Sequence, residues 1–240
     1  MKSRAVKAAA PSFGRRSENP VRLSSPDRIV EAIAEGIRAG RFVPGQRLIE
    51  GDLTHNLNVS RGPVREALKR LSAEGIVTLT LHRGAYIRAM HREESKKLLD
   101  VLEVLTGLAA NLAAHEIQVE GNKQRMLEAY DHLKQIHEGG GVVSYLVERR
   151  HFYDTVIEIG GNDQIARVLP TMQIHIMRMQ FRSYWTAKED EDQFNDYSLI
   201  SSAILEGDAR KAERQMKLHI RRIRRGIDRL PDAAFPVPTT

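Results

Sequence analysis

The sequence VSRGPVREALKRLSAEGIV, residues 59–77, decides the fold of the first third of this chain. Four apolar residues recur in it at helical spacing and predict one buried face, namely Val64, Ala67, Leu68 and Leu71. Ser60 stands where an N-cap is expected, and Pro63 fits the first turn because the amide hydrogen it lacks has no helical partner there. The other face carries arginine and lysine, so the segment predicts a helix that packs by one side and presents basic side chains on the other.

Short elements flank this helix on both sides. Residues 26–40 carry isoleucines at helical spacing and end at a glycine, and residues 48–57 describe a second short helix that stops near Asn58. After Gly75, apolar residues on either side of a turn at 82–84 predict a small β-hairpin. Three short helices followed by a hairpin are typical of a winged helix-turn-helix, which is a DNA-binding fold.

The charge of the chain is divided unevenly. Residues 1–92 hold 17 Lys and Arg against 8 Asp and Glu, whereas residues 93–240 hold 20 against 23. Excess positive charge on one segment is expected where that segment contacts a polyanion such as DNA. The first 24 residues are rich in Lys, Arg, Ser, Pro and Gly and predict a disordered basic arm, either a DNA contact or a solvated tail.

From Arg92 to about Leu230 the apolar spacing is helical almost throughout. After a first helix from residue 92, later helices are expected at about 120–138, 142–159, 162–186, 190–206 and 208–229. Such a series predicts an antiparallel bundle of about six helices. The chain is therefore expected to be mostly α, with an arm (1–24), a winged helix-turn-helix (25–91), an all-helical bundle (92–230) and a tail (231–240).

Six segments resemble a known family of bacterial transcription regulators. PGQRL (44–48), the segment 59–77 and HRGAYI (82–87) resemble the N-terminal DNA-binding domain of the GntR family. VLEVLTGLAANLAA (101–114), FYDTVIEIGGN (152–162) and AILEGDARKAERQMKLHI (203–220) resemble FCD, the all-helical effector-binding and dimerisation domain of its FadR-type branch. The resemblance implies a homodimer that binds a palindromic double-stranded DNA operator and responds to a small-molecule effector.

The first turns of the recognition helix are the expected base-reading site. That end of the helix enters the major groove in such folds, so Ser60, Arg61 and Arg65 are the expected contacts. Arg61 and Arg65 lie four residues apart, opposite Val64, and an arginine can bind guanine O6 and N7 with two hydrogen bonds. A solvated basic face is the alternative interpretation.

Further DNA contacts are expected from Lys69 and from the wing tip, His82, Arg83 and Gly84, where glycine permits a tight turn close to the backbone of DNA. One departure from the family concerns the second helix. Relatives often carry a basic residue in its first turn, where this chain has Glu50-Gly51-Asp52. That difference weakens the expectation of a DNA contact from the second helix.

The FCD domains of relatives commonly hold a divalent metal, but the matching positions of this chain carry different side chains. Counted from the glycine-containing turns at 160–162 and 206–208, the resemblance places those positions at Arg149, Tyr153, Tyr197 and His219. A guanidinium does not ligate metals at neutral pH and a phenol is a poor ligand, so one histidine cannot build an ordinary Zn²⁺ or Ni²⁺ site. We expect no metal and no other cofactor.

Two interpretations of these inward polar residues remain open. They satisfy one another, for example Arg149 against a phenol, because buried polar groups need partners. Alternatively, Arg149 anchors an anionic metabolite, a carboxylate or a phosphate, with Arg178 and Arg182 assisting from the expected helix 162–186. His175 is a further candidate for that pocket, unless it is simply an ordinary buried or exposed histidine.

Composition and motifs argue against several other functions. The chain has no cysteine, which excludes disulfides, thiolate zinc clusters and a cysteine nucleophile. Uninterrupted apolar stretches are short and the first 20 residues lack a signal-peptide core, so a cytoplasmic protein without a membrane partner is expected. No phosphate-binding loop, HExxH or nucleophile elbow is present, and no enzymatic activity is expected. The alternatives to a ligand-responsive repressor are a metal-dependent sensor or helical enzyme fused to a DNA-binding domain, and a non-specific DNA-binding protein.

Overall fold

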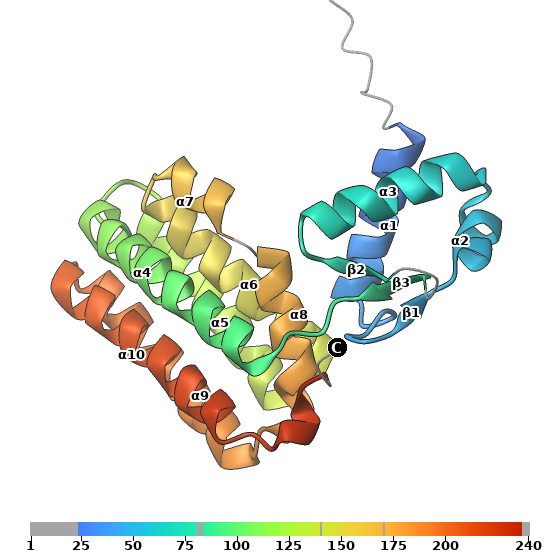
Figure 1. Ribbon diagram of the computed structural model, residues 1–240. Helices are drawn as coiled ribbons and strands as arrows, with labels where there is room; N and C mark the ends of the chain where they lie inside the picture. Colours follow the sequence, from blue (N-terminus) through green and yellow to red (C-terminus); the bar gives the residue numbers. More distant parts are fainter. Residues whose placement is uncertain (1–23, 81–83, 140, 170, 237–240) are drawn as a thin grey trace, which may run out of the picture.

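The structure is a computed structural model that describes residues 24–80, 84–139, 141–169 and 171–236, without the side chains of Val142, Val143, Thr171 and Met172. The described residues form ten α-helices, two short 3₁₀ turns and a three-stranded sheet. They gather into two groups, each with its own hydrophobic core (Figure 1). Nearly all of the expected basic arm, together with His82 and Arg83 of the expected wing tip, lies outside the described residues.

The first group, here called the winged-helix group, runs from α1 to β3. Its elements are α1 (Ser25–Arg38), β1 (Arg47–Leu48), α2 (Glu50–Leu57), α3 (Arg61–Ala73), β2 (Val77–Thr80) and β3 (Gly84–Ile87). Strand β3 lies between β1 and β2 and is antiparallel to both, with Val77 opposite Ile87. The four apolar residues predicted for the buried face of α3 are all in the core of this group, as expected. The predicted winged helix-turn-helix is thus the fold that the chain adopts.

One local prediction in this group is wrong. Leu48 lies in β1 rather than in the second helix, because it pairs with Ala85 of β3 and is buried in the shared core. The second helix therefore begins later, at Glu50, and ends at Asn58, whose φ of 49° takes the left-handed conformation that stops a helix. Ser60 does occupy the N-cap position of α3, but its side chain makes no capping hydrogen bond.

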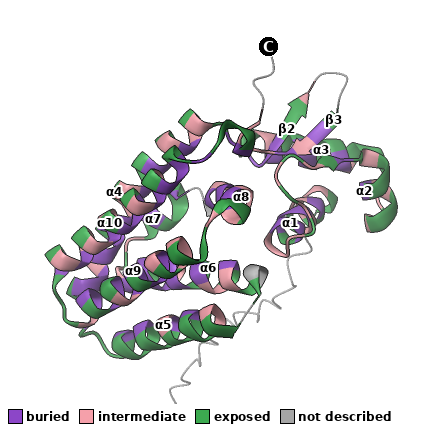
Figure 2. Ribbon diagram, turned by 90° about the horizontal axis from the view of Figure 1, so that it is seen from below, coloured by how far each residue is buried: buried purple, intermediate pink, exposed green. Residues whose placement is uncertain are grey.

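The second group, here called the helical group, is an all-helical bundle. Its elements are α4 (Arg92–Glu116), α5 (Asn122–Gly139), α6 (Val142–Ile159), α7 (Asp163–Val168), α8 (Thr171–Phe181), α9 (Ala187–Leu205) and α10 (Ala209–Asp228). Helices α4 and α10 lie side by side along their length, and α6 and α9 also pack against α4. Figure 2 shows that the buried residues of these helices face the interior of the bundle.

The expected helix at 162–186 is in fact two helices. The chain breaks between α7 and α8, where Leu169 is extended, with φ of −70° and ψ of 118°. A residue that precedes proline is pushed out of the helical region by the proline ring, and Pro170 follows Leu169. Helix α8 then ends at Phe181 and is followed by a 3₁₀ turn over Arg182–Tyr184. The bundle has seven helices in the described residues instead of about six.

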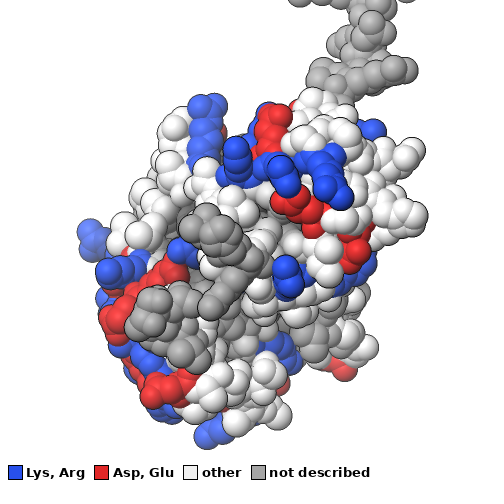
Figure 3. All heavy atoms as spheres, turned by 45° about the vertical axis from the view of Figure 1, so that its right-hand side comes forward, with Lys and Arg blue, Asp and Glu red and all other residues white. Residues whose placement is uncertain are grey.

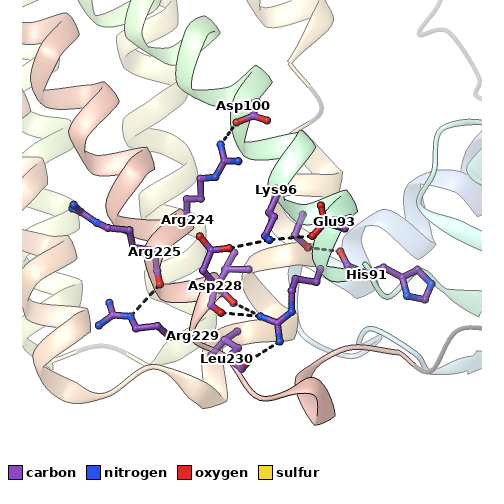
Figure 4. Close-up of polar contacts among 12 residues, drawn as sticks. His91, Glu93, Lys96, Asp100, Arg224, Arg225, Asp228, Arg229 and Leu230 are labelled. Atoms are coloured by element: carbon purple, nitrogen blue, oxygen red, sulfur yellow. Dashed lines mark hydrogen bonds and ion pairs between the residues drawn. The ribbon is translucent and has the colours of Figure 1, made fainter.

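Hydrogen bonds and ion pairs of charged side chains join the C-terminal end of α10 to the N-terminal end of α4. The Arg92 guanidinium donates to the carbonyl oxygens of Ile227 and Asp228, both at 3.0 Å, where unpaired helix carbonyls need donors. Lys96 pairs with the Asp228 carboxylate at 3.3 Å, and Arg224 pairs with an aspartate on α4 (Figure 4). These contacts hold the two longest helices of the bundle in register.

Helix α4 is long and apolar enough, by length and composition alone, to cross a membrane, although short polar interruptions divide its apolar stretch. Of the 18-residue window that meets this criterion, 44% is buried inside the structure. Its inward residues, among them Leu99, Leu102 and Ala110, belong to the bundle core. Burial in the bundle accounts for part of the apolar composition of α4, whose outer residues Val101, Val104 and Leu108 are exposed.

Residues 231–236, which were expected to begin a tail, pack against the helical group. Ala234 is buried, and its carbonyl oxygen accepts a hydrogen bond of 3.1 Å from Nε2 of Gln180 on α8. The ring of Phe235 lies under the Arg92 guanidinium, 4.3 Å from its centroid, in a cation–π contact. These residues therefore extend the core around the end of α8.

Candidate functional site

The exposed face of α3 presents the basic residues that the sequence predicts as DNA contacts. Ser60, Arg61, Arg65 and Lys69 are all exposed, and the buried side of the same helix holds them at a fixed angle to the winged-helix core. Neither Arg61 nor Lys69 forms an ion pair within the described part of the chain. Figure 3 shows Lys and Arg side chains on the surface of the molecule with acidic side chains between them. The exposed face of α3 therefore carries two basic residues that form no ion pair in the described structure, Arg61 and Lys69, together with arginines that are paired with acids.

Two arginines of α3 are held by acids from neighbouring helices. Nε of Arg65 lies 3.0 Å from Oε2 of Glu50, in the first turn of α2. Arg70 pairs with Asp27 of α1 and with Glu66, both at 2.7 Å, and the hydrogen bonds from Ser24 and Arg70 lower the pKa of Asp27. Arg70 thus links α1 to α3. Arg65, in contrast, is paired through Nε alone, and its terminal nitrogens make no ion pair in the described residues.

At the wing, Gly84 begins β3 with φ of 96°, a conformation that side chains other than glycine rarely adopt. A side chain at this position would point toward the Arg47 guanidinium of β1, 3.6 Å away. The structure thus describes the two strands of the predicted hairpin up to Thr80 and from Gly84. The roles of the expected contacts His82 and Arg83 stay predictions, because these residues lie outside the described ranges.

The helical group contains a cavity between α6 and α8, here called the α6–α8 cavity. It is small and partly open to solvent, and the centre of a water molecule can reach about 30 Å³ of it. Four of the seven residues expected at an effector site line it, namely Arg149, Tyr153, His175 and Arg178. Leu102 and Leu146 supply apolar walls. The two arginines come from α6 and α8, which are distant in sequence and meet only through the packing of the bundle.

The remaining expected residues lie elsewhere. Tyr197 and His219 do not line the cavity but are fully buried behind Tyr153, whose ring centroid is 6.2 Å from that of Tyr197 and 6.5 Å from that of His219. Arg182 also lies away from the cavity, since it follows the end of α8 and pairs with Asp190 at 2.7 Å. Of the two arginines expected to assist Arg149, the structure therefore places Arg178 at the cavity and Arg182 outside its lining.

Asp196, which the sequence analysis did not single out, holds His219 in place. Its carboxylate lies 3.1 Å from Nδ1 of His219 and accepts two hydrogen bonds, of 2.9 and 3.2 Å, from Arg222. Burial lowers the pKa of His219 to about 4, against the effect of Asp196, whereas His219 and Arg222 lower the pKa of Asp196. The sequence did contain one indication of this role, because Asp196 is an acidic residue directly beside Tyr197, on the inward face of α9.

Several polar atoms around the cavity have no hydrogen-bond partner in the described structure. They include Nε of Arg149, Nε and Nη2 of Arg178, and the hydroxyls of Tyr153 and Tyr197. The guanidinium of Arg149 instead lies over the Tyr153 ring, 5.0 Å from its centroid. Nε of Arg149 thus has no phenol oxygen as a partner, although, against the effect of burial, Tyr197 and Tyr153 are close enough to raise the pKa of Arg149.

The donors at the positions of the family's metal site do not fit a divalent cation. No three His, Asp or Glu side chains come together among the described residues. Nδ1 of His219 is engaged by Asp196, whose own charge is neutralised by Arg222. Arg149 and Arg178 add two positive charges at the same place, and both lower the pKa of His219 by charge repulsion. A metal ion would be repelled by the guanidiniums and would find only one free imidazole nitrogen.

Helix α8 also connects the cavity to the winged-helix group. Ile176 is fully buried in the core of that group, although His175 and Arg178 on the same helix line the cavity. Nε2 of Gln173 donates a hydrogen bond of 2.9 Å to the carbonyl oxygen of Glu74, the C-cap of α3. No sequence pattern indicated this shared role, because it depends on contacts between residues about a hundred positions apart.

Comparison with known proteins identifies a matching family for each of the two groups. Residues 26–87 match the family described as bacterial regulatory proteins, gntR family, and residues 97–222 match the FCD domain. The chain belongs to the GntR family. It is a transcriptional regulator of the type that joins a GntR helix-turn-helix domain to an FCD domain, as the sequence resemblance indicated.

Relatives with this organisation cover most of the chain. The transcriptional repressor GlaR of Escherichia coli is 24% identical over 191 residues, 75% of this chain and 86% of its own length. The regulator LutR of Bacillus subtilis is 25% identical over 207 residues, 77% of this chain and 92% of its own. A GntR regulator from Rhodococcus sp. RHA1 has the same fold, with a TM-score of 0.73, 22% identity and coverage of 85% of this chain and 98% of that one.

Proposed function

We propose that this GntR regulator is a ligand-responsive repressor that binds a palindromic DNA operator as a homodimer and changes its affinity for DNA when a small anionic metabolite enters the α6–α8 cavity. The observation that carries the proposal is the pair of buried arginines in that cavity, Arg149 on α6 and Arg178 on α8, the helix that also contacts the winged-helix group. Separate contacts support DNA reading, dimer formation and the effect of the ligand on DNA binding.

DNA reading is assigned to the exposed face of α3. Arg65 has its Nε bound to Glu50, which leaves the two terminal nitrogens as the donor pair for a guanine edge. Arg61 lies one turn earlier and has no ion-pair partner in the described structure. Lys69 is further along the helix and is assigned to the DNA phosphates, where a point charge contributes without reading sequence.

Dimer formation is assigned to the outer face of α4. Val101, Val104 and Leu108 are exposed there by 49%, 61% and 41%. Their spacing of three and four residues places them on one stripe of the helix. An apolar stripe on the surface favours pairing with a second copy, because a twofold axis brings the same stripe from both chains together. Twofold symmetry would in turn present two α3 helices to a palindromic site.

Helix α8 supplies a physical route from effector to DNA. An anion that binds Arg178 changes the position that α8 prefers, and α8 carries Ile176 into the winged-helix core. The same helix bonds the end of α3 through Gln173. Operator affinity changes only if the anion binds the two arrangements of α8 with different affinity, which is the condition for allosteric coupling.

The experiment is an anisotropy titration of operator DNA, selected from a random library, with and without a panel of small organic acids and phosphates. We expect at least one anion to change operator affinity in the wild type but not in Arg149→Gln. Arg167→Gln serves as the matched control, because Arg167 is an exposed arginine of the same group that pairs with Asp163 outside the cavity.

Two results would contradict the proposal. If every anion leaves operator affinity unchanged at several salt concentrations, the cavity has no regulatory role. If specific and scrambled DNA bind equally and with the same steep salt dependence, the protein is a non-specific DNA-binding protein instead. A loss of response in Arg167→Gln equal to that in Arg149→Gln would remove the assignment to the cavity.

A further inference from the structure

The α6–α8 cavity is lined by two arginine side chains that are almost completely removed from water. Arg149 is 5% exposed and Arg178 is 8% exposed. A guanidinium stays protonated in proteins, so both side chains keep their positive charge in the interior. Burying a charge is unfavourable unless a charge of opposite sign and hydrogen bonds accompany it.

The described structure places no acid to neutralise them, and neither arginine takes part in a salt bridge there. Asp154 lines the cavity but pairs with Arg150 at 3.3 Å, on the more exposed side of α6. Asp196 is shared between His219 and Arg222. The nearby acids are therefore already paired with other cations.

Neutral groups meet only part of the hydrogen-bonding needs of the two guanidiniums. Nη1 of Arg178 donates a hydrogen bond of 2.7 Å to the buried amide oxygen of Gln193. Arg149 lies over the Tyr153 ring. Three guanidinium nitrogens and the Tyr153 hydroxyl remain without partners in the described structure, and all belong to residues that line the cavity.

The two guanidiniums also act on each other. Both side chains line the same cavity, and burial and the charge of Arg149 both lower the pKa of Arg178. A ligand with one negative charge would neutralise one of them and leave the other buried and unpaired. A ligand with two negative charges would neutralise both.

We infer that the α6–α8 cavity takes a small dianion, held by Arg149 and Arg178 directly and without a metal ion. The inference rests on the proposed function and specifies its ligand. The required chemistry is two negative charges on one small molecule, as in a short dicarboxylate or a phosphate monoester. A carboxylate can meet the planar fork of a guanidinium with two hydrogen bonds, and the Tyr153 hydroxyl can donate one more.

The test compares ligands that differ in charge but little in size. Full-length protein treated with EDTA is titrated calorimetrically at pH 8 with butyrate and succinate, and separately with dimethyl phosphate and methyl phosphate, which are a monoanion and a dianion, at constant ionic strength. We expect one dianion of the panel to bind at least about tenfold more tightly than its matched partner, as for one added hydrogen-bonded charge. The succinate and phosphate arms distinguish the two forms of dianion.

Charge-removing variants give the second readout. In Arg178→Gln one positive charge is lost, so the preference for the dianion over its matched partner should fall to about one. Without ligand, the same variant should melt at the same or a higher temperature than the wild type, because a buried charge without a counter-ion has been removed. Arg167→Gln should keep the wild-type preference.

The outcomes separate the inference from the proposed function. If monoanions bind as tightly as dianions and still change operator affinity, the dianion inference is wrong and the proposed function stands. If no anion binds, both fail. If binding requires added Zn²⁺ or Ni²⁺, or if Arg178→Gln lowers the melting temperature and keeps the wild-type preference, direct binding by two arginines is overturned.

Discussion

Nε of Arg65 on the recognition helix lies 3.0 Å from Oε2 of Glu50 at the start of α2. This ion pair orients the arginine through Nε, and its terminal nitrogens take part in no ion pair among the described residues. It also explains why an acid is compatible with a turn where relatives often carry a basic residue. We propose that this acid orients Arg65 and does not itself contact DNA.

The first prediction concerns this pair. Arg65→Ala should reduce discrimination between operator and scrambled DNA by about 1–3 kcal/mol, as for other arginines that read guanine. Glu50→Gln should reduce discrimination less, by below about 1 kcal/mol, and should raise affinity for all DNA because a negative charge near the phosphates is removed. Anisotropy titrations with both DNAs measure the two effects. Lys69→Ala is the control, expected to weaken both DNAs alike, and equal losses for Arg65→Ala on both DNAs would contradict base reading.

A second prediction concerns Tyr153, whose hydroxyl is buried without a partner in the described structure. Tyr153→Phe should leave the melting temperature unchanged or raise it, since no hydrogen bond is lost. It should weaken anion binding about tenfold, because a hydrogen bond to a charged ligand is worth more than a neutral one. Calorimetric titration checks this. Tyr197→Phe is the control, because Tyr197 is also unpartnered but does not line the cavity, and an equal loss there would argue against a ligand contact at Tyr153.

The third prediction is a pH dependence of stability. Burial lowers the pKa of His219 to about 4, below the value of about 6.5 in an unfolded chain. The unfolded state therefore binds the proton first, so this stabilisation is complete above pH 6.5 and is lost as the pH falls toward 4. The loss is about 3 kcal/mol for such a shift. His175, whose pKa burial also lowers to about 4, adds to it.

Urea unfolding at pH 7 and pH 4.5 measures this dependence. In His219→Gln the amide can still donate to Asp196 but does not titrate, so the difference between the two pH values should shrink by roughly half. His132→Gln, at an exposed position on α5, should keep the wild-type difference. Equal stability of the wild type at both pH values would show that neither histidine is held neutral by burial.

The fourth prediction concerns transmission through α8. Gln173→Ala removes the hydrogen bond to the Glu74 carbonyl and leaves the cavity lining intact. Anion affinity in the absence of DNA should stay within about twofold, whereas the change in operator affinity caused by the anion should shrink. Paired calorimetry and anisotropy measure the two quantities. Gln164→Ala, at an exposed position on α7, should behave as the wild type, and an unaltered response in Gln173→Ala would exclude this contact from the coupling.

The fifth prediction concerns dimerisation. Val104→Glu places a charge in the exposed stripe of α4 and should convert the dimer to a monomer, with weaker operator binding. Light scattering after size-exclusion chromatography reports the mass. Val168→Glu is matched in exposure, at 60% against 61%, but lies on α7 and should remain dimeric. Two variants with the same mass would argue against the α4 face as the interface.

The fold was largely predictable because its signals are local. Helical spacing in α3 placed Val64 and Leu71 on a buried face, and the structure buries both. The errors arose where a contact distant in sequence or a ring constraint outweighed local spacing. Leu48 joined a strand because β3 offered it a partner, and Pro170 divided a segment whose apolar pattern continued across it.

The candidate site was predictable only in part. Family resemblance pointed to Arg149, Tyr153, Tyr197 and His219, and the structure brings all four to one region of the bundle. It separates them, however, into two that line the cavity and two that lie behind it. Sequence spacing could not make that division, because side chains one helical turn apart share a face whether or not a cavity lies in front of them.

The sequence by itself determined the family, the winged helix and the helical bundle, and the identity of the charged groups, since these follow from spacing and composition along short segments. Tertiary structure alone decided which charges are compensated. Asp196 lies beside His219 and Arg222, Arg182 pairs with Asp190, and Arg149 and Arg178 line one cavity without an ion pair among the described residues. The physical reason is that the energy of a buried charge depends on its neighbours in space, which only the packing of α6 against α8 supplies.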